Sequence, residues 1–300
     1  MEKRTFRAVF FDLDGTLLPM DVDVFMKSYF RALGGYVARM GIAPDQFMAG
    51  MKRGITAMAT NDSGHANAES FWPEFLACID LPEGLTADAL QDAIGDFYEN
   101  EFGELGADVQ PNPAAARAIE ALVAKGYPLV LATMPMFPRR AVEWRLRWAG
   151  IDPAVFSRIT TFENSTAVKP KPDYYAENLA AAGVEGRDVL MVGNNTKEDL
   201  AACQLGCEGF LVTDFLIDPV GFEVFSVRHG SMEKFADWVD SLPECADPAQ
   251  GVSDAIVPAA VRERVLAACG IADGQAGGAK TLEEAGRSGG TDFVINGMED

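Results

Sequence analysis

The chain has 300 residues and a formal charge of −20, because 45 acidic side chains outnumber 25 basic ones. Such an excess of carboxylates repels nucleic acid backbones and anionic membrane surfaces, and no basic patch in the sequence opposes it. No stretch reaches the roughly eighteen apolar residues that a membrane-spanning helix needs. We therefore expect a globular protein that binds neither nucleic acid nor membrane, with a main domain and a second lobe.

The five cysteines are scattered along the chain, and no histidine lies near them to complete a metal site. Cys203 and Cys207 stand at helical spacing, which we interpret as two small buried residues. This usage predicts a reducing compartment. Because the first residues run directly into an apolar strand without a leader-like segment, we expect a cytoplasmic protein.

The first predicted element is a buried strand at 7–11, with the sequence "RAVFF". Residues 21–108 follow with apolar positions at helical spacing and no strand-like run, which predicts an all-helical insertion. Its helices are expected at 23–41, 44–59, 69–79 and 86–102. Phe71, Trp72 and Phe75 form an aromatic stripe, which we interpret as core packing between helices in preference to a ligand-stacking site.

From residue 109 onward, strand-like and helical patterns alternate. Nearly continuous apolar runs predict strands at 127–132, 188–193 and 208–213. Patterns that each end at a glycine predict helices at 112–126, 138–150, 172–183 and 196–206. Such alternation is typical of α/β proteins, so we expect a Rossmann-like, doubly wound parallel sheet with an inserted helical cap.

These patterns divide the chain into three regions. Residues 1–20 and 109–245 are expected to form the Rossmann-like core, residues 21–108 the cap, and residues 246–300 a C-terminal helix with a flexible tail. The tail is rich in glycine and poor in residues that could form a core. Within it, "DFVING" at 292–297 has the composition of a short strand that could dock on the core.

Polar side chains follow the predicted strands, at the edge where open α/β sheets bind their ligands. In chain order they are Asp12, Asp14, Thr16, Thr133, Lys169 in "KPKP", Asn194, Asn195 and Asp199. Taken alone, Thr133 would be interpreted as a strand-end residue that caps a turn. Lys171 competes with Lys169 for the same place, and we favour Lys169.

In order, spacing and strand context, these residues resemble the motifs of the haloacid dehalogenase superfamily over residues 5–215. The segment 12–16, "DLDGT", resembles the first motif, Thr133 the second, Lys169 the third and 193–199 the fourth. The resemblance is to the phosphatase branch with a helical cap of the C1 type, as in phosphoglycolate phosphatases. Asp14 argues against the dehalogenase branch, which lacks the second aspartate and works on carbon without a metal.

The resemblance implies a Mg²⁺-dependent phosphatase that hydrolyses small phosphorylated metabolites through an aspartyl-phosphate. Asp12 would be the nucleophile and Asp14 the acid and base for the leaving oxygen and the water. The implied Mg²⁺, whose charge offsets the crowded carboxylates, would be held by Asp12, the backbone carbonyl of Asp14, Asn194 and Asp199. The implied phosphate-binding groups are Thr16, Thr133, the Met134 amide and Lys169.

One position departs from the resemblance. The family usually carries aspartate directly after the glycine of the fourth motif, whereas Asn194 follows Gly193 here. We therefore expect weak Mg²⁺ binding, and two other functions stay open: a phosphate-binding or interaction protein with little turnover, and a phosphomutase that uses the same intermediate.

The cap is expected to supply substrate specificity. Its loop 60–69, "TNDSGHANAE", is dense in residues that form turns. If the loop faces the site, Asn61, Asp62 and His65 should tune specificity; if it does not, it is a solvated connector between two cap helices.

Overall fold

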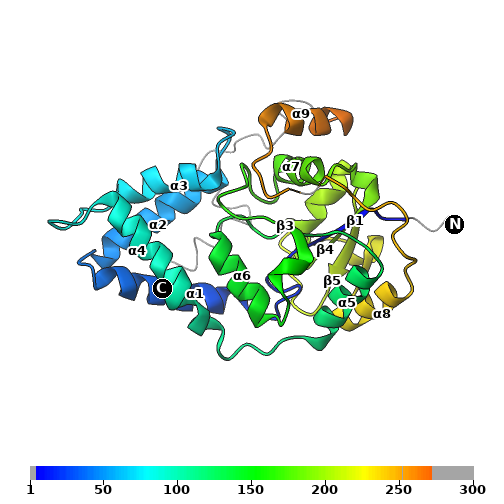
Figure 1. The fold of residues 1–300 in the computed structure, drawn as a ribbon, viewed down its shortest axis with the longest axis horizontal. Helices are drawn as coiled ribbons and strands as arrows, with labels where there is room; N and C mark the ends of the chain where they lie inside the picture. Colours follow the sequence, from blue (N-terminus) through cyan, green and yellow to red (C-terminus); the bar gives the residue numbers. More distant parts are fainter. Residues whose placement is uncertain (1–4, 252, 272–300) are drawn as a thin grey trace.

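A computed structural model describes residues 5–251 and 253–271 (Figure 1). Within them the core is a six-stranded, all-parallel sheet in the order β3-β2-β1-β4-β5-β6, so the predicted fold class is confirmed. The strands are β1 Ala8–Phe11, β2 Leu129–Leu131, β3 Phe156–Ile159, β4 Val189–Gly193, β5 Glu208–Val212 and β6 Arg228–Gly230. The four runs predicted as strands all form strands, whereas β3 and β6 contain charged residues and lack a continuous apolar run.

The strand order places a topological switch point beside β1. β2 and β3 follow on one side of β1 in the strand order, and the chain then crosses back so that β4 lies on the other side of β1. Phe11 at the end of β1 is in register with Leu131 of β2 and with Val192 of β4. The carboxyl ends of these three strands therefore lie next to one another, where doubly wound sheets bind their ligands.

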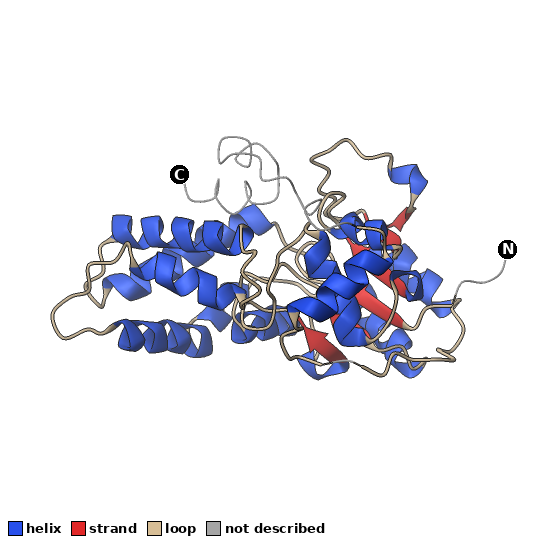
Figure 2. Ribbon diagram, turned by 90° about the horizontal axis from the view of Figure 1, so that it is seen from above, coloured by secondary structure: helices blue, strands red, loops and turns tan. Residues whose placement is uncertain are grey.

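Helices cover both faces of the sheet (Figures 1 and 2). One face packs against α5 Pro113–Ala124, α6 Arg139–Trp148 and α8 Met232–Asp240, and the other against α7 Pro172–Ala182 and the 3₁₀ helix η4 Asp199–Leu205. The glycines predicted to end the four core helices all have positive φ, a conformation in which a side chain would be strained. The helix predicted at 196–206 forms as the shorter 3₁₀ helix η4, which lies between β4 and β5 in the chain and packs against α7.

Between β1 and α5 the chain forms four α-helices and a 3₁₀ turn, in agreement with the predicted helical insertion. They are α1 Val22–Ala38, α2 Pro44–Ala59, α3 Asn67–Leu76, α4 Ala87–Asn100 and η1 Phe102–Gly106. Their apolar faces enclose an aromatic-rich cluster that is continuous with one face of the sheet. We call residues 21–108 the cap, which lies beside the sheet along the long axis of the molecule (Figures 1 and 2).

A set of hydrogen bonds ties the start of α3 to the loops that follow β2 and β3. These bonds are Asn67 N to Ser165 O (2.9 Å), Asn67 Nδ2 to Pro135 O and Ala167 O (both 3.2 Å), and Ala68 N to Phe162 O (2.8 Å). Asn67 is fully buried. Lys171 adds a further bond from its Nζ to Asn61 O at 2.9 Å. We call these five hydrogen bonds the cap–core clamp.

The predicted C-terminal helix is present as α9 Ala259–Ala268, which packs on α7 (Figure 1). The buried Arg158 of β3 holds the segment before α9 by donating to Ser253 O and Ala255 O. The predicted flexible tail and the short strand at 292–297 lie outside the described residues. In the part of the chain that is described, no helix has the length and hydropathy to cross a membrane.

Candidate active site

The loop that follows β1 passes very close to the end of β4. Gly15 sits in this loop with φ +78°, and a Cβ placed on it would lie 2.3 Å from Nδ2 of Asn194. Only glycine fits this position, because a side chain would be strained at this φ and would clash with Asn194. The close approach brings Asp12, Asp14 and Thr16 against the β4 loop, as the shared sheet edge predicts.

Asp12 lies at the centre of the site with both carboxylate oxygens engaged. Its Oδ1 accepts a hydrogen bond from Nζ of Lys169 at 2.8 Å, and its Oδ2 accepts one from Oγ1 of Thr16 at 3.1 Å. The residue is 8% exposed, so these bonds compensate for the removal of the charge from water. The same two contacts hold the carboxylate in one orientation.

Lys169 is buried between two carboxylates. Its Nζ also donates to Oδ1 of Asp199 at 2.6 Å. Burial alone would lower the pKa of Lys169, but the carboxylates of Asp12 and Asp199 outweigh it and raise the pKa well above its usual range. The ammonium group is therefore charged. Lys171, the rival from the same loop, points instead to the cap–core clamp.

Asp199 has no free oxygen in this arrangement. Its Oδ1 bonds Lys169, and its Oδ2 accepts from the backbone N of Asn195 at 2.9 Å. The side chain also packs against Gly193, where an added Cβ would lie 2.2 Å from Oδ2. These contacts favour a role for Asp199 in holding Lys169 and the 193–199 loop, and its role as a metal ligand stays a prediction.

Asn194 and Thr16 form the second half of the site. Nδ2 of Asn194 donates to Phe215 O at 2.5 Å, which turns Oδ1 toward Thr16, whose hydroxyl lies 3.1 Å away. One hydroxyl of Thr16 thus contacts both Asp12 Oδ2 and Asn194 Oδ1. Asp12 Oδ2 and Asn194 Oδ1 therefore converge on one hydroxyl, and both are hard oxygens of the kind that Mg²⁺ prefers.

These oxygens fit a magnesium ion that keeps several waters. Within residues 5–251 and 253–271, no group of three His, Cys, Asp or Glu side chains is gathered as a ready metal site. Mg²⁺ usually binds through one or two carboxylates together with waters and substrate oxygens, so such a group is not needed. Asp12 and Asn194 are the two side chains whose oxygens converge.

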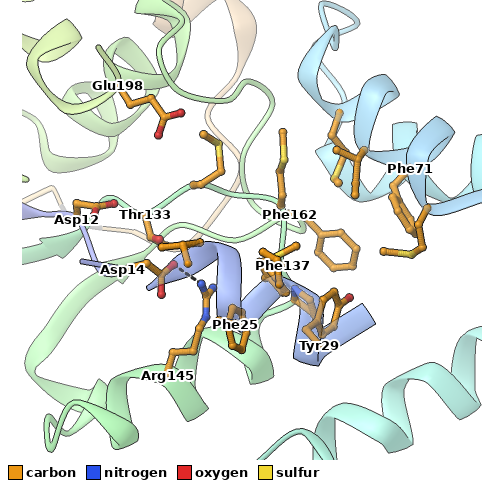
Figure 3. A pocket seen from close by; sticks show the side chains of 18 of the residues that line it. Asp12, Asp14, Phe25, Tyr29, Phe71, Thr133, Phe137, Arg145, Phe162 and Glu198 are labelled. Carbon is orange, nitrogen blue, oxygen red and sulfur yellow. Dashed lines mark hydrogen bonds and ion pairs between the residues drawn. The ribbon is translucent and has the colours of Figure 1, made fainter. Parts of the chain in front are cut away.

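Asp14 is held by a residue from outside the four motifs. Arg145 on α6 forms a hydrogen-bonded ion pair with Oδ2 of Asp14, and its guanidinium also lies over the ring of Phe137, 4.4 Å from the centroid (Figure 3). The Arg145 side chain is 2% exposed. Burial raises the pKa of the Asp14 carboxyl, opposed by Arg145 and reinforced by the charge of Asp12.

Three buried polar atoms at the site have no hydrogen-bond partner among the described residues. They are Oδ1 of Asp14, Oγ1 of Thr133 and Nη2 of Arg145. The backbone carbonyl of Thr133 accepts from Oγ1 of Thr160 and from the hydroxyl of Tyr174, which fixes the backbone just after β2. Because a buried polar atom without a partner costs free energy, this cluster points to a polar ligand.

Glu198 is a further acidic group that the sequence interpretation passed over. It is partly buried and lines the same cavity as Asp12 and Asp199 (Figure 3). Burial, opposed by the charge of Lys169, raises the pKa of its carboxyl to about 8. The only signal in the sequence is its place next to Asp199.

The site opens into a cavity of about 150 Å³ between the sheet edge and the cap. Its polar end is formed by Asp12, Asp14, Thr133, Arg145, Asn194, Asn195, Glu198 and Asp199. Met134 lines it as well. The structure therefore brings together the residues predicted from all four strand ends, with Lys169 and Thr16 bonded directly behind Asp12.

The three cap residues proposed for specificity are not brought to this cavity. Asp62 and His65 are exposed, and Asn61 is buried within its own loop. Its Nδ2 donates to His65 O and to Oδ1 of Asn67, while its Oδ1 accepts from Ser63. The segment 60–69 is thus bonded within itself and to Lys171, and other cap residues line the cavity. A role in specificity for Asn61, Asp62 and His65 stays a prediction.

Comparisons with known proteins agree with this fold. The 2-haloacid dehalogenase of Pseudomonas syringae superimposes with a TM-score of 0.51 and 18% identity, over 78% of this chain and 97% of that one. A predicted phosphoglycolate phosphatase of Haemophilus somnus gives 0.49 and 18%, over 79% and 99%. CbbY of Rhodobacter sphaeroides in complex with phosphate gives 0.48 and 20%, over 77% and 96%. No curated protein matches significantly, whereas the family model of haloacid dehalogenase-like hydrolases matches residues 6–205.

Proposed function

Because the chain belongs to the haloacid dehalogenase-like hydrolases, we propose that it is a phosphatase that hydrolyses phosphate monoesters through an aspartyl-phosphate on Asp12. One observation carries the proposal: Asp12 is fixed beside the buried cation of Lys169, while Asp14, two residues further on, keeps one carboxylate oxygen that has no partner among the described residues. A second carboxylate at this place suits proton transfer to a leaving oxygen.

The reaction divides one displacement into two. An oxygen of Asp12 attacks phosphorus, the bond from phosphorus to the alcohol oxygen breaks, and Asp14 gives that oxygen a proton. Asp14 then takes a proton from water as the water attacks the aspartyl-phosphate, which releases inorganic phosphate and restores Asp12. Lys169 offsets negative charge on Asp12 and on the phosphoryl group, and Thr133 Oγ1 and the Met134 amide hold phosphoryl oxygens.

A metal ion has a place in this proposal. Asp12 Oδ2 and Asn194 Oδ1 would hold Mg²⁺, together with the backbone carbonyl of Asp14 that the family resemblance implies. When bound, Mg²⁺ would neutralise charge on the transferring phosphoryl group. The fourth motif contains two acidic residues. Asp199 bonds and positions Lys169, whereas Glu198 lines the cavity and has no bond to Lys169 in the described structure.

We expect wild-type protein to release inorganic phosphate steadily from a phosphomonoester, with EDTA abolishing the release, and Asn194→Asp to bind Mg²⁺ roughly tenfold more tightly. The added formal charge attracts the cation more strongly. Much of this gain is offset, because the aspartate carboxylate is costlier to desolvate and repels the phosphate. The substitution also removes the donor that Asn194 gives to Phe215 O. Calorimetric titration with Mg²⁺ and the Mg²⁺ dependence of phosphate release measure the change.

Asn195→Asp is the matched control, because it adds the same charge one residue away. The Oδ1 of Asn195 caps the turn by accepting from the backbone N of Lys197 and Glu198, and an aspartate can do the same. Equal Mg²⁺ affinity in Asn194→Asp and wild type would remove Asn194 from the metal site. If no phosphate is released from any ester, the alternative of a phosphate-binding protein is favoured. If the phosphoryl group appears on an isomeric product instead, the phosphomutase is favoured.

Arg145→Met should lower kcat for the hydrolysis of alkyl phosphates on the order of tenfold to a hundredfold. It should lower kcat for p-nitrophenyl phosphate much less. Arg145 anchors one oxygen of Asp14 and so aims the other, and p-nitrophenolate leaves without needing a proton. The ratio of kcat values for the two substrates is therefore the informative measurement, because a general loss of structure would lower both equally.

Two variants serve as controls for Arg145→Met. Arg145→Lys keeps the charge and should retain part of the alkyl phosphatase rate. Arg147→Met changes an exposed arginine of the same helix, so its kcat ratio should equal that of wild type. If Arg145→Met slows both substrates by the same factor, Arg145 is not a positioning residue for Asp14.

A further inference from the structure

The cap gives the cavity an almost wholly apolar wall. From the cap come Val22, Phe25, Met26, Tyr29, Leu33, Met51, Ile55, Met58, Phe71, Trp72, Phe75, Ile94 and Tyr98. The core adds Met136, Phe137, Pro138, Phe162 and Ile217 around the same space. The charged groups gather at the sheet edge, so the cavity is polar at one end and apolar at the other (Figure 3).

The two hydroxyl groups in the cap wall are already paired with each other. The hydroxyls of Tyr29 and Tyr98 lie 2.6 Å apart in a buried hydrogen bond. Burial raises the pKa of both tyrosines, so neither carries charge at neutral pH. No other cap residue that lines the cavity has a polar side-chain atom, apart from the indole nitrogen of Trp72. A hydroxyl-rich substrate would therefore lose its bonds to water and gain few in return.

On this basis, and resting on the proposed phosphatase function, we infer that the substrate is a phosphate monoester of an apolar alcohol. The phosphoryl group binds beside Asp12, and the hydrocarbon part lies against α1, α2 and α3. Sugar phosphates are disfavoured, since each hydroxyl buried without a partner weakens binding.

The size of the cavity limits the alcohol. An apolar cavity of roughly 150 Å³ in another protein is known to hold benzene, and the whole cavity here, its polar end included, has a volume of about 150 Å³. Because the phosphoryl group takes part of this space, the organic group is no larger than about one ring or a short branched chain. A much larger alcohol would require the cap to move.

The first test compares two esters that differ in their hydroxyl groups. Cyclohexylmethyl phosphate and glucose 6-phosphate are both phosphates of a primary alcohol on a six-membered ring. We expect kcat/KM to be higher for cyclohexylmethyl phosphate by on the order of a hundredfold or more. Equal or greater kcat/KM for glucose 6-phosphate overturns the inference and leaves the phosphatase proposal intact.

A pair of variants on α2 locates the preference in the cap. Met51 lines the cavity, whereas Met48, on the same helix, packs in the cluster without lining it. Met51→Gln should raise KM for cyclohexylmethyl phosphate about tenfold with kcat less affected, because a similar shape now carries an amide. Met48→Gln should leave KM within about twofold. An equal KM in both variants contradicts the assigned position.

A binding measurement keeps the inference testable even without turnover or with an unstable variant. Cyclohexylmethylphosphonate cannot be hydrolysed, and we expect wild-type protein to bind it at least roughly tenfold more tightly than methylphosphonate in calorimetry. If neither ester is hydrolysed but this difference holds, the phosphatase proposal fails and the apolar site stands. Equal binding of the two phosphonates overturns the apolar site.

Discussion

Asp12→Asn is expected to give a folded protein whose phosphatase activity is lower by on the order of 10⁴-fold or more, as for the loss of a nucleophile elsewhere. An amide is too weak a nucleophile to attack phosphorus. The shape is unchanged, and an asparagine can still accept from Lys169 and place its NH₂ toward the hydroxyl of Thr16. Initial rates of phosphate release and a thermal unfolding curve measure the two effects.

Asp21→Asn is a suitable control for this variant. Asp21 caps α1 by accepting from the backbone N of Val24, a role that asparagine fills equally well. The rate of phosphate release by Asp21→Asn should match that of wild type. A rate within tenfold of wild type in Asp12→Asn would show that Asp12 is not the nucleophile.

Lys169→Met should be the most destabilising single change at the site, by about 3–5 kcal/mol in the free energy of unfolding. The variant leaves Asp12 and Asp199 buried side by side without the ammonium group that bonds both. Phosphate release should be lost as well, since the same charge faces the phosphoryl group. Urea unfolding and initial rates measure the two losses.

Two further proteins separate the electrostatic cause from packing. In Lys169→Met/Asp199→Asn one buried charge is removed, so much of the stability should return while activity stays absent. Lys171→Met changes the neighbouring lysine, which bonds the cap at Asn61 O, so its kcat should stay close to wild type. If Lys171→Met loses activity and Lys169→Met keeps it, the two lysines have been assigned in the wrong order.

The sequence predicts the sheet edge well and its surroundings poorly. Apolar runs mark β1, β2, β4 and β5, and parallel strands end at a common edge, so Asp12, Thr133 and Asn194 could be placed together from spacing alone. Lys169 could be favoured over Lys171 from the sequence, because Pro172 suits the first turn of a helix and leaves Lys171 beside the helix start. The structure agrees, since α7 begins at Pro172 and Lys169 is the lysine that bonds Asp12.

Arg145 illustrates what sequence cannot supply. It lies on a helix with Arg139, Arg140 and Arg147, and only packing against Phe137 and Asp14 shows which arginine is buried. The aromatic stripe of Phe71, Trp72 and Phe75 shows a second limit of the sequence interpretation. Phe71 and Phe75 are buried in the cluster, as the core interpretation predicts, yet both also line the cavity. The same side chains therefore pack in the core and line the cavity, so core packing does not exclude contact with a ligand.

The cap–core clamp has a consequence for how tightly the two halves move together. Its α3 end bonds backbone carbonyls between 135 and 167, and residues 162–167 lead directly into Lys169. At about 1 kcal/mol net for each hydrogen bond, these five bonds add to the apolar cluster that runs from the cap to one face of the sheet, and together they hold the cap on the core. A cap that shifts without detaching must pull this loop along with it. We therefore expect a ligand at the apolar end that shifts the cap to shift the ammonium group beside Asp12 as well.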